Sequence, residues 1–213
     1  MNVFIFGPEH TLQEWRSVEI PEPSAINLIY STEKTPGNPW LKVPDAIFYL
    51  FPEQDSTILD WLETSGAPIC IVNNVIHTSL DLRPKMIRIN AWTGFLSGTI
   101  TELAAPLGVE TKDIDELMNL MGRKSEWVPD QVGMISPRVL ACIINEAFYA
   151  IEDQVSSETE IDVAMKMGTN YPLGPVEWGK KIGLALIYQL LNELSITSKR
   201  YTPSSLLKKE ALA

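Results

Sequence analysis

The first residues that could do chemistry follow a short apolar run near the N-terminus. Residues 3–6 (Val-Phe-Ile-Phe) stop at Gly7, as the buried first strand of a dinucleotide-binding fold stops at a glycine. In that fold two more glycines follow in a G-x-G-x-x-G pattern, and the next helix receives a pyrophosphate on its N-terminus. Here Glu9 and Leu12 occupy the second and third glycine positions. Gly7 is therefore a candidate cofactor-binding residue of a degenerate loop, and the Glu9 carboxylate opposes a bound phosphate.

The thiols and imidazoles indicate neither a disulfide nor a metal site. Cys70 and Cys142 both lie inside apolar runs, where a small buried thiol is the commoner state. His10 and His77 have no ligand spacing with cysteines or acidic clusters. We therefore predict no bound metal.

The composition is that of an ordinary soluble globular protein, with 213 residues, 45% apolar and 21% charged. The formal net charge of −10 is spread along the chain, which excludes a nucleic-acid footprint or an anionic-membrane patch. No apolar run is long enough to span a membrane, and no basic segment indicates a signal peptide. We therefore expect a cytoplasmic protein with no nucleic-acid or membrane partner.

Residues 1–128 alternate short apolar runs with helical segments, which predicts an α/β domain. Runs that are apolar throughout are typical of strands covered on both faces, as in a parallel sheet. Strands are predicted at Val3–Phe6, Ile26–Tyr30, Ala46–Phe51, Ile69–Val72 and Ile87–Asn90. Helices are predicted over Ser56–Ser65 and Thr111–Met121, each followed by a glycine.

Two crossovers of this sheet leave little room for covering helices. Between the first two strands only Thr11–Val18 could be helical, because Pro21 and Pro23 follow. Three prolines and a glycine exclude a helix between Tyr30 and Ala46. A sheet face without its helices must be covered in another way, and a partner chain is one such cover.

The pattern of residues 129–213 predicts helices alone. Ser136 is expected to cap a helix whose first residue is a proline. Ser157 and Glu160 form a capping box that starts another helix. Apolar residues at helical spacing predict long helices over Pro137–Asp153 and about Ile182–Leu194.

Four stretches of this helical half resemble the C-terminal domain of 3-hydroxyacyl-CoA dehydrogenases. They are Val132–Ala147 (VGMISPRVLACIINEA), Glu160–Gly168 (EIDVAMKMG), Pro172–Leu184 (PLGPVEWGKKIGL) and Tyr201–Lys209 (YTPSSLLKK). More faintly, residues 1–128 resemble a shortened and degenerate version of the Rossmann-like NAD-binding domain of these enzymes. The resemblance implies an NAD-dependent oxidoreductase of fatty-acid metabolism that forms a homodimer through its helical domain.

The resemblance also assigns the catalytic positions of the family to residues of this chain. Glu102 matches the glutamate that orients the catalytic histidine, and counting back from it places Asn90 at the histidine position. The serine that contacts the substrate corresponds to Val75, and the asparagine before an arginine in the helical domain corresponds to Pro137. Since an amide has no conjugate acid near neutral pH, Asn90 cannot act as the base.

Three functions remain open after these substitutions. Asn73 and Arg138 are expected to line the cleft between the domains, and an acyl-CoA-like small molecule is the expected class of ligand. The substitutions favour a homodimer that binds or interacts, transfers no hydride and needs no cofactor. The first alternative is an active NAD-dependent dehydrogenase whose base comes from elsewhere. The second is another enzyme that acts on a CoA thioester in the interdomain cleft.

Overall fold

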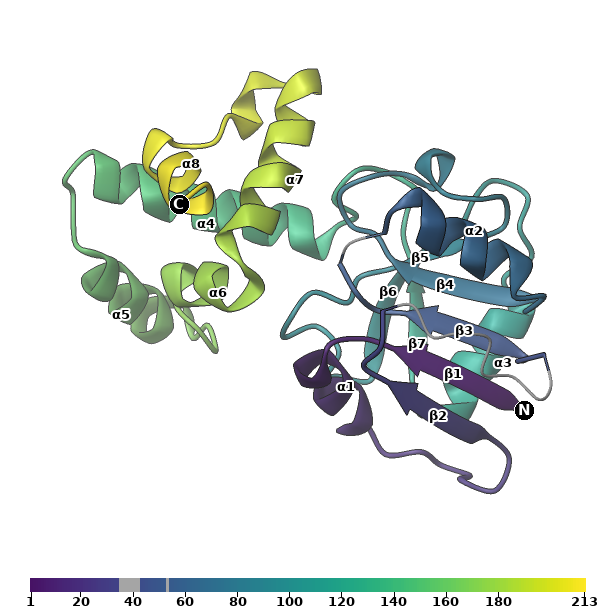
Figure 1. The fold of residues 1–213 in the computed structure, drawn as a ribbon. Coiled ribbons are helices and arrows are strands. Elements are labelled where there is room, and N and C mark those ends of the chain that lie inside the picture. Colours follow the sequence, from purple (N-terminus) through teal and green to yellow (C-terminus); the bar gives the residue numbers. More distant parts are fainter. Residues whose placement is uncertain (35–42, 53) are drawn as a thin grey trace. The chain divides into compact units, whose positions relative to one another are not determined.

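A computed structural model describes residues 1–34, 43–52 and 54–213, which fold as two compact units (Figure 1). The first unit covers residues 1–134 and the second covers residues 135–213. The sequence pattern predicts this boundary at residue 128. Residues 129–134 belong to the first unit because they bond to it: the Gly133 amide donates to the Val75 carbonyl oxygen at 2.7 Å, and the Ser79 amide donates to the Asp130 carboxylate at 3.1 Å.

Within the described residues, a seven-stranded sheet forms the centre of the first unit. Its strands are β1 (Asn2–Phe6), β2 (Asn27–Ser31), β3 (Ala46–Tyr49), β4 (Ile69–Asn73), β5 (Ile87–Ile89), β6 (Ile100–Ala104) and β7 (Lys124–Trp127). They lie in the order β2-β1-β3-β4-β5-β6-β7, and every neighbouring pair is parallel except β5 and β6. The predicted α/β sheet and its five predicted strands are confirmed. Strands β6 and β7 are not predicted by the sequence pattern.

Helices cover both faces of this sheet. They are α1 (Glu9–Arg16), α2 (Ser56–Thr64) and α3 (Lys112–Leu120), with a short 3-10 turn η1 (Ser79–Asp81). Apolar residues of α1 and α3 pack with Val3, Ile5 and Phe48 on one face. Those of α2 pack with Ile47 and Tyr49 on the other face.

Helix α1 begins at Glu9, two residues before the predicted start at Thr11. Pro8 takes the N-cap position, and the Glu9 carboxylate lies in the first turn, where the helix dipole favours a negative charge. The predicted absence of a helix between Tyr30 and Ala46 falls mostly on residues 35–42, which lie outside the described residues.

The second unit contains helices and no strand in its described residues. They are α4 (Ser136–Glu152), α5 (Glu158–Thr169), α6 (Pro175–Ile182), α7 (Leu184–Thr197), a 3-10 turn η2 (Lys199–Tyr201) and α8 (Ser205–Ala211). The capping box of Ser157 and Glu160 is confirmed. The prediction that Ser136 caps α4 is wrong. The chain turns at Gly133 and Met134, which both have positive φ, so Ile135 takes the N-cap position and Ser136 is the first helical residue.

Two polar side chains join the helices of this unit. The Asn145 amide donates to the Thr202 carbonyl oxygen and accepts from the Ser204 amide, both at 2.9 Å. The Asp162 carboxylate caps α6 by accepting from the first free amides of that helix. Gly174 permits this approach, because a Cβ there would collide with Asp162. Across the described ranges, no helix is long and apolar enough to cross a membrane.

Candidate functional site

Asn90 and Glu102, which the sequence analysis placed in one site, lie side by side in the structure. Asn90 follows β5 directly, and the antiparallel pairing of β5 with β6 puts Glu102 opposite it. The Asn90 amide nitrogen Nδ2 donates to Glu102 Oε2 at 3.3 Å, and its oxygen Oδ1 accepts from the Trp92 backbone amide at 3.3 Å. Both side chains are buried. The carboxamide is therefore bonded at both ends, and it neither gains nor loses a proton near neutral pH.

Asn73 and Val75 lie at the carboxyl end of the neighbouring strand β4. Asn73 is buried, donates to the Leu50 carbonyl oxygen and accepts from the Ala91 amide, both at 3.1 Å. It therefore links the ends of β3, β4 and β5. Val75 is buried, and its backbone oxygen accepts from the Arg88 guanidinium. Its apolar side chain cannot make the hydrogen bond that a serine would offer to a substrate.

Gly7 is placed where the predicted loop requires it, but the loop has few donors for an anion. A Cβ on Gly7 would lie 3.1 Å from the Leu50 Cβ, so glycine lets the end of β1 approach the chain that follows β3. Pro8 has no N–H group, and the exposed Glu9 carboxylate bonds to Arg16 at 3.1 Å. These residues are poorly suited to a pyrophosphate, which needs several converging N–H groups and no nearby carboxylate.

Glu14 ties the loop that follows Asn90 to helix α1. Its carboxylate accepts from the Gly94 amide at 2.8 Å and, at 3.4 Å, from the Leu96 amide. Gly94 has a φ of 98°, a conformation that glycine adopts readily. The loop beside the candidate site is therefore held by a carboxylate of the chain itself. The sequence does not predict this contact, because Glu14 and Gly94 are eighty residues apart.

Arg88 is a second residue near the candidate site that the sequence does not predict. It is fully buried, and its guanidinium bonds to the carbonyl oxygens of Asn74 at 2.9 Å and Val75 at 3.3 Å. It also bonds to the Gln131 carbonyl oxygen at 3.2 Å and to the Asp130 carboxylate at 2.6 Å. The sequence signal that could have indicated this buried residue is an arginine inside an otherwise apolar run.

Arg88 and Asp130 each favour the charged form of the other. Burial lowers the pKa of Arg88, and the hydrogen bond and charge of Asp130 oppose that shift. Burial raises the pKa of Asp130, but hydrogen bonds from Ser79 and Arg88 outweigh it, so that this pKa lies below its ordinary value. The cluster therefore holds the loop after β4 and residues 130–131 as one charged network.

The other predicted site residues lie in the helical unit. Pro137 is buried in the first turn of α4, where its missing N–H group costs no hydrogen bond. The Arg138 guanidinium carbon lies 5.9 Å from the centre of the Tyr201 ring. In the described part of the chain, no three or more histidines, cysteines and acidic residues gather into a metal site. Cys70 and Cys142 are free thiols.

Comparison with protein families identifies the helical unit. Residues 133–213 match the family model of the 3-hydroxyacyl-CoA dehydrogenase C-terminal domain. The chain is 38% identical over 116 residues to the 3-hydroxyadipyl-CoA dehydrogenase of Escherichia coli (strain K12). This matched region covers 54% of this chain and 24% of that protein. It is 39% identical over 96 residues to the 3-hydroxybutyryl-CoA dehydrogenase of Clostridioides difficile, and the matched region covers 44% of this chain and 34% of that protein. The chain thus matches only a minor part of the length of these curated relatives.

Solved structures show a similar fold. The 3-hydroxybutyryl-CoA dehydrogenase of Escherichia coli K12 has a TM-score of 0.59 at 31% identity, covering 67% of this chain and 31% of that one. The (S)-3-hydroxybutyryl-CoA dehydrogenase of Ralstonia eutropha has a TM-score of 0.75 at 18% identity, covering 98% and 92%. This second likeness shows the fold alone, a Rossmann-type domain followed by a helical domain. The helical unit of this chain therefore belongs to the 3-hydroxyacyl-CoA dehydrogenase family as its C-terminal domain, and the resemblance found in the sequence is confirmed.

Proposed function

We propose that this chain is a 3-hydroxyacyl-CoA dehydrogenase-like protein that transfers no hydride and acts as a binding homodimer. The observation that carries the proposal is the pair formed by Asn90 and Glu102. In the enzymes that the chain resembles, a histidine held by this glutamate takes the hydroxyl proton of the substrate. General-base catalysis is worth about 10²–10⁴-fold in rate, and a carboxamide cannot supply it.

The other substituted positions support the same proposal. Val75 puts a buried apolar side chain at the position of a hydrogen-bonding serine, and Pro137 stands at the position of an asparagine. The loop at Gly7 has lost two glycines and gained the Glu9 carboxylate. Without a pyrophosphate cradle, NAD would have to bind through its remaining groups alone, at low affinity. We therefore assign no nicotinamide cofactor to the chain, and an acyl-CoA-like molecule remains the proposed ligand.

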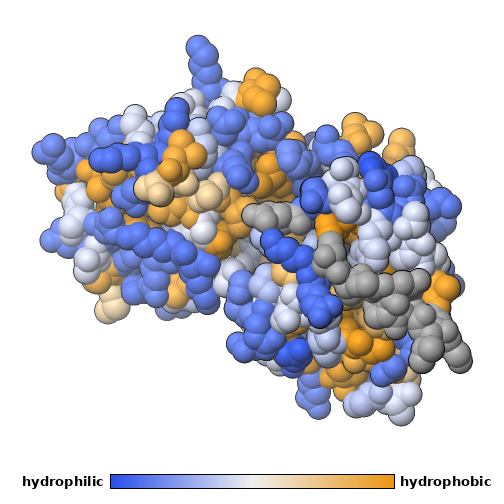
Figure 2. All heavy atoms as spheres, in the orientation of Figure 1, coloured by the Kyte–Doolittle hydropathy of each residue, from blue (hydrophilic) through white to orange (hydrophobic). Residues whose placement is uncertain are grey.

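Exposed apolar side chains on the helical unit support the homodimer. Helix α5 has no buried residue, and Val163 and Met167, one turn apart on it, are 50% and 84% exposed. Ile135 and Val139 at the start of α4 are also more than half exposed. Figure 2 shows apolar side chains among the polar ones on the visible face of this unit. A second copy of the chain would bury such a surface by self-complementary contact.

Sedimentation tests the homodimer. Wild-type protein at micromolar concentration should sediment as a dimer, and the double variant Val163→Glu/Met167→Glu as a monomer. Asn192→Gln, an exposed polar change on α7 rather than on α5, should leave the dimer intact. A monomeric wild type would overturn this part of the proposal.

Activity measurements test the loss of hydride transfer. Oxidation of NADH in the presence of acetoacetyl-CoA should stay at background for wild type and for Asn90→His, because one histidine restores neither the substrate contacts nor the cofactor loop. Turnover by wild type would favour the alternative of an active NAD-dependent dehydrogenase. His77→Ala would then test whether His77, in the loop after β4, is the base. Binding of acetoacetyl-CoA without turnover would support the proposal.

A further inference from the structure

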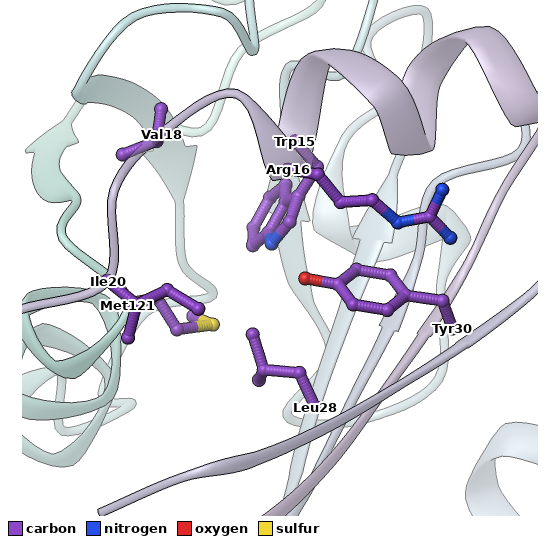
Figure 3. Close-up of a pocket in the computed structure, with 7 residues that line it drawn as sticks. All are labelled: Trp15, Arg16, Val18, Ile20, Leu28, Tyr30 and Met121. Atoms are coloured by element: carbon purple, nitrogen blue, oxygen red, sulfur yellow. The ribbon is translucent and has the colours of Figure 1, made fainter. Parts of the chain in front are cut away.

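A small cavity in the first unit is lined by none of the residues assigned above to catalysis or to cofactor binding. It has a volume of about 190 Å³ and opens between α1, the edge strand β2 and the end of α3 (Figure 3). Val18, Ile20, Leu28 and Met121 form its apolar walls. A cavity of about 150 Å³ with apolar walls is known to accept benzene, so this cavity has room for a molecule of that size.

The walls of the cavity are held in place by contacts outside it. Gly122 has a φ of 73°, and a Cβ there would collide with the Glu19 carbonyl oxygen, so glycine lets the Glu19 segment pack on the end of α3. The Arg123 guanidinium stacks on the Trp15 ring at 4.0 Å and donates to the Trp15 carbonyl oxygen at 2.9 Å. The site is therefore largely formed before any ligand binds, which lowers the entropic cost of binding.

One hydroxyl group points into this apolar space. Figure 3 shows the Tyr30 hydroxyl directed at the centre of the cavity, between Trp15 and Met121. Burial raises the pKa of Tyr30, and the charges of Arg16 and Arg123 oppose that shift without cancelling it. The hydroxyl is therefore protonated at neutral pH and available as a hydrogen-bond donor.

Two arginines make the surroundings of this hydroxyl positive. The Arg16 guanidinium carbon lies 4.4 Å from the centre of the Tyr30 ring, and its charge is partly balanced by Glu9 at 3.1 Å. Arg123 is 2% exposed, and burial lowers its pKa to about 10, so it keeps its charge at neutral pH. The Arg123 guanidinium donates to the carbonyl oxygens of Trp15, Leu96 and Gly98 and to the Thr101 hydroxyl, all of them neutral groups.

We propose that this cavity binds a small organic carboxylate, with its apolar body against Leu28 and Met121 and its carboxylate at the Tyr30 hydroxyl. Charge complementarity carries the choice of an anion, because the Arg123 guanidinium, which stacks on Trp15 outside the cavity lining, is buried among neutral partners and favours a negative charge nearby. Size and apolar walls carry the choice of a compact body, such as a single ring or a short chain. The site is independent of the proposed loss of hydride transfer.

Titration calorimetry and ligand-detected NMR with benzoate and benzamide as probes test this proposal. Benzoate should bind wild type at least tenfold more tightly than its neutral analogue benzamide. Tyr30→Phe removes only the hydroxyl and should weaken benzoate binding about tenfold, as expected for one hydrogen bond to a charged group. Leu28→Trp fills the cavity and should abolish binding.

The cavity-filling variant Leu28→Trp has a matched control. Ile29→Trp changes the neighbouring, more exposed residue of β2 and should bind benzoate like wild type, with circular dichroism confirming that both tryptophan variants are folded. Equal affinity for benzoate and benzamide, no binding of either probe, or unchanged binding by folded Leu28→Trp would each overturn the proposal. NADH titrated in parallel keeps this outcome separate from that of the proposed function.

Discussion

Replacing Arg88 with methionine should destabilise the first unit by about 3 kcal/mol. Removal of one partner of a buried ion pair costs roughly 3–5 kcal/mol, because the other partner keeps its charge without compensation. The side chain of Asp130 is 21% exposed and retains its bonds from Ser79, so water can partly compensate it. This places the expected cost near the lower end of that range. The carbonyl oxygens of Asn74 and Val75 also lose their donor.

Urea unfolding followed by tryptophan fluorescence measures this cost. Five of the six tryptophans lie in residues 1–134, so the signal reports mainly on the first unit. With a slope of about 1–3 kcal/mol per molar urea, a loss of 3 kcal/mol lowers the midpoint by about 1–3 M. Hydrogen exchange of peptides that cover residues 74–79 and 129–134 should become faster in the variant.

A second arginine provides the control. Arg83 pairs with Asp60 at the surface, where Asp60 is 61% exposed, and Arg83→Met should leave the urea midpoint close to that of wild type. Arg88→Lys keeps the charge but not the forked geometry and should fall between wild type and Arg88→Met. If Arg88→Met unfolds within about 0.5 kcal/mol of wild type, the network does not hold these loops together, and the reasoning is wrong.

Three further predictions concern single side chains. The pKa of Asp130 is lower in the folded state than in the unfolded chain. Its contribution to stability is therefore complete above the unfolded pKa of about 3.9 and is lost as pH falls through the folded pKa. The difference in stability between wild type and Asp130→Asn, measured by urea unfolding, should shrink below about pH 4. Asn145→Ala should cost about 1–3 kcal/mol and speed hydrogen exchange of the Ser204 amide, which donates to Asn145 Oδ1, and unchanged exchange would contradict this. Glu14→Ala should release the loop at Gly94, seen as faster exchange there, whereas Glu14→Gln should keep part of the protection.

The sheet of the first unit was predictable where strands are buried on both faces. A short, uniformly apolar run such as that of β3 is too short for a buried helix and therefore indicates a strand. Strands β6 and β7 contain Glu102 and Lys124, and their order beyond β5 depends on pairing between distant segments. Local patterns do not carry such pairing, so both strands escaped prediction.

The candidate site was predictable only in part. The spacing of Asn90 and Glu102 in a family pattern was enough to expect them together, and the structure places them 3.3 Å apart. The hydrogen-bond partners of Arg88 lie in two loops, and Asp130 is more than forty residues away from Arg88 in the sequence. The cavity at Tyr30 forms where α1, β2 and α3 meet. Contacts of this kind depend on tertiary structure, and a single sequence without its fold does not reveal them.

The affinity for NADH, measured by titration calorimetry at neutral pH, tests the central claim most directly. The loop at Gly7 offers one glycine, a proline without an N–H group and a carboxylate, so we predict a dissociation constant no better than about 1 mM, a binding free energy weaker than about 4 kcal/mol. Binding in the low micromolar range would show that the chain still holds its dinucleotide, and would contradict the account of a family member that has lost hydride transfer.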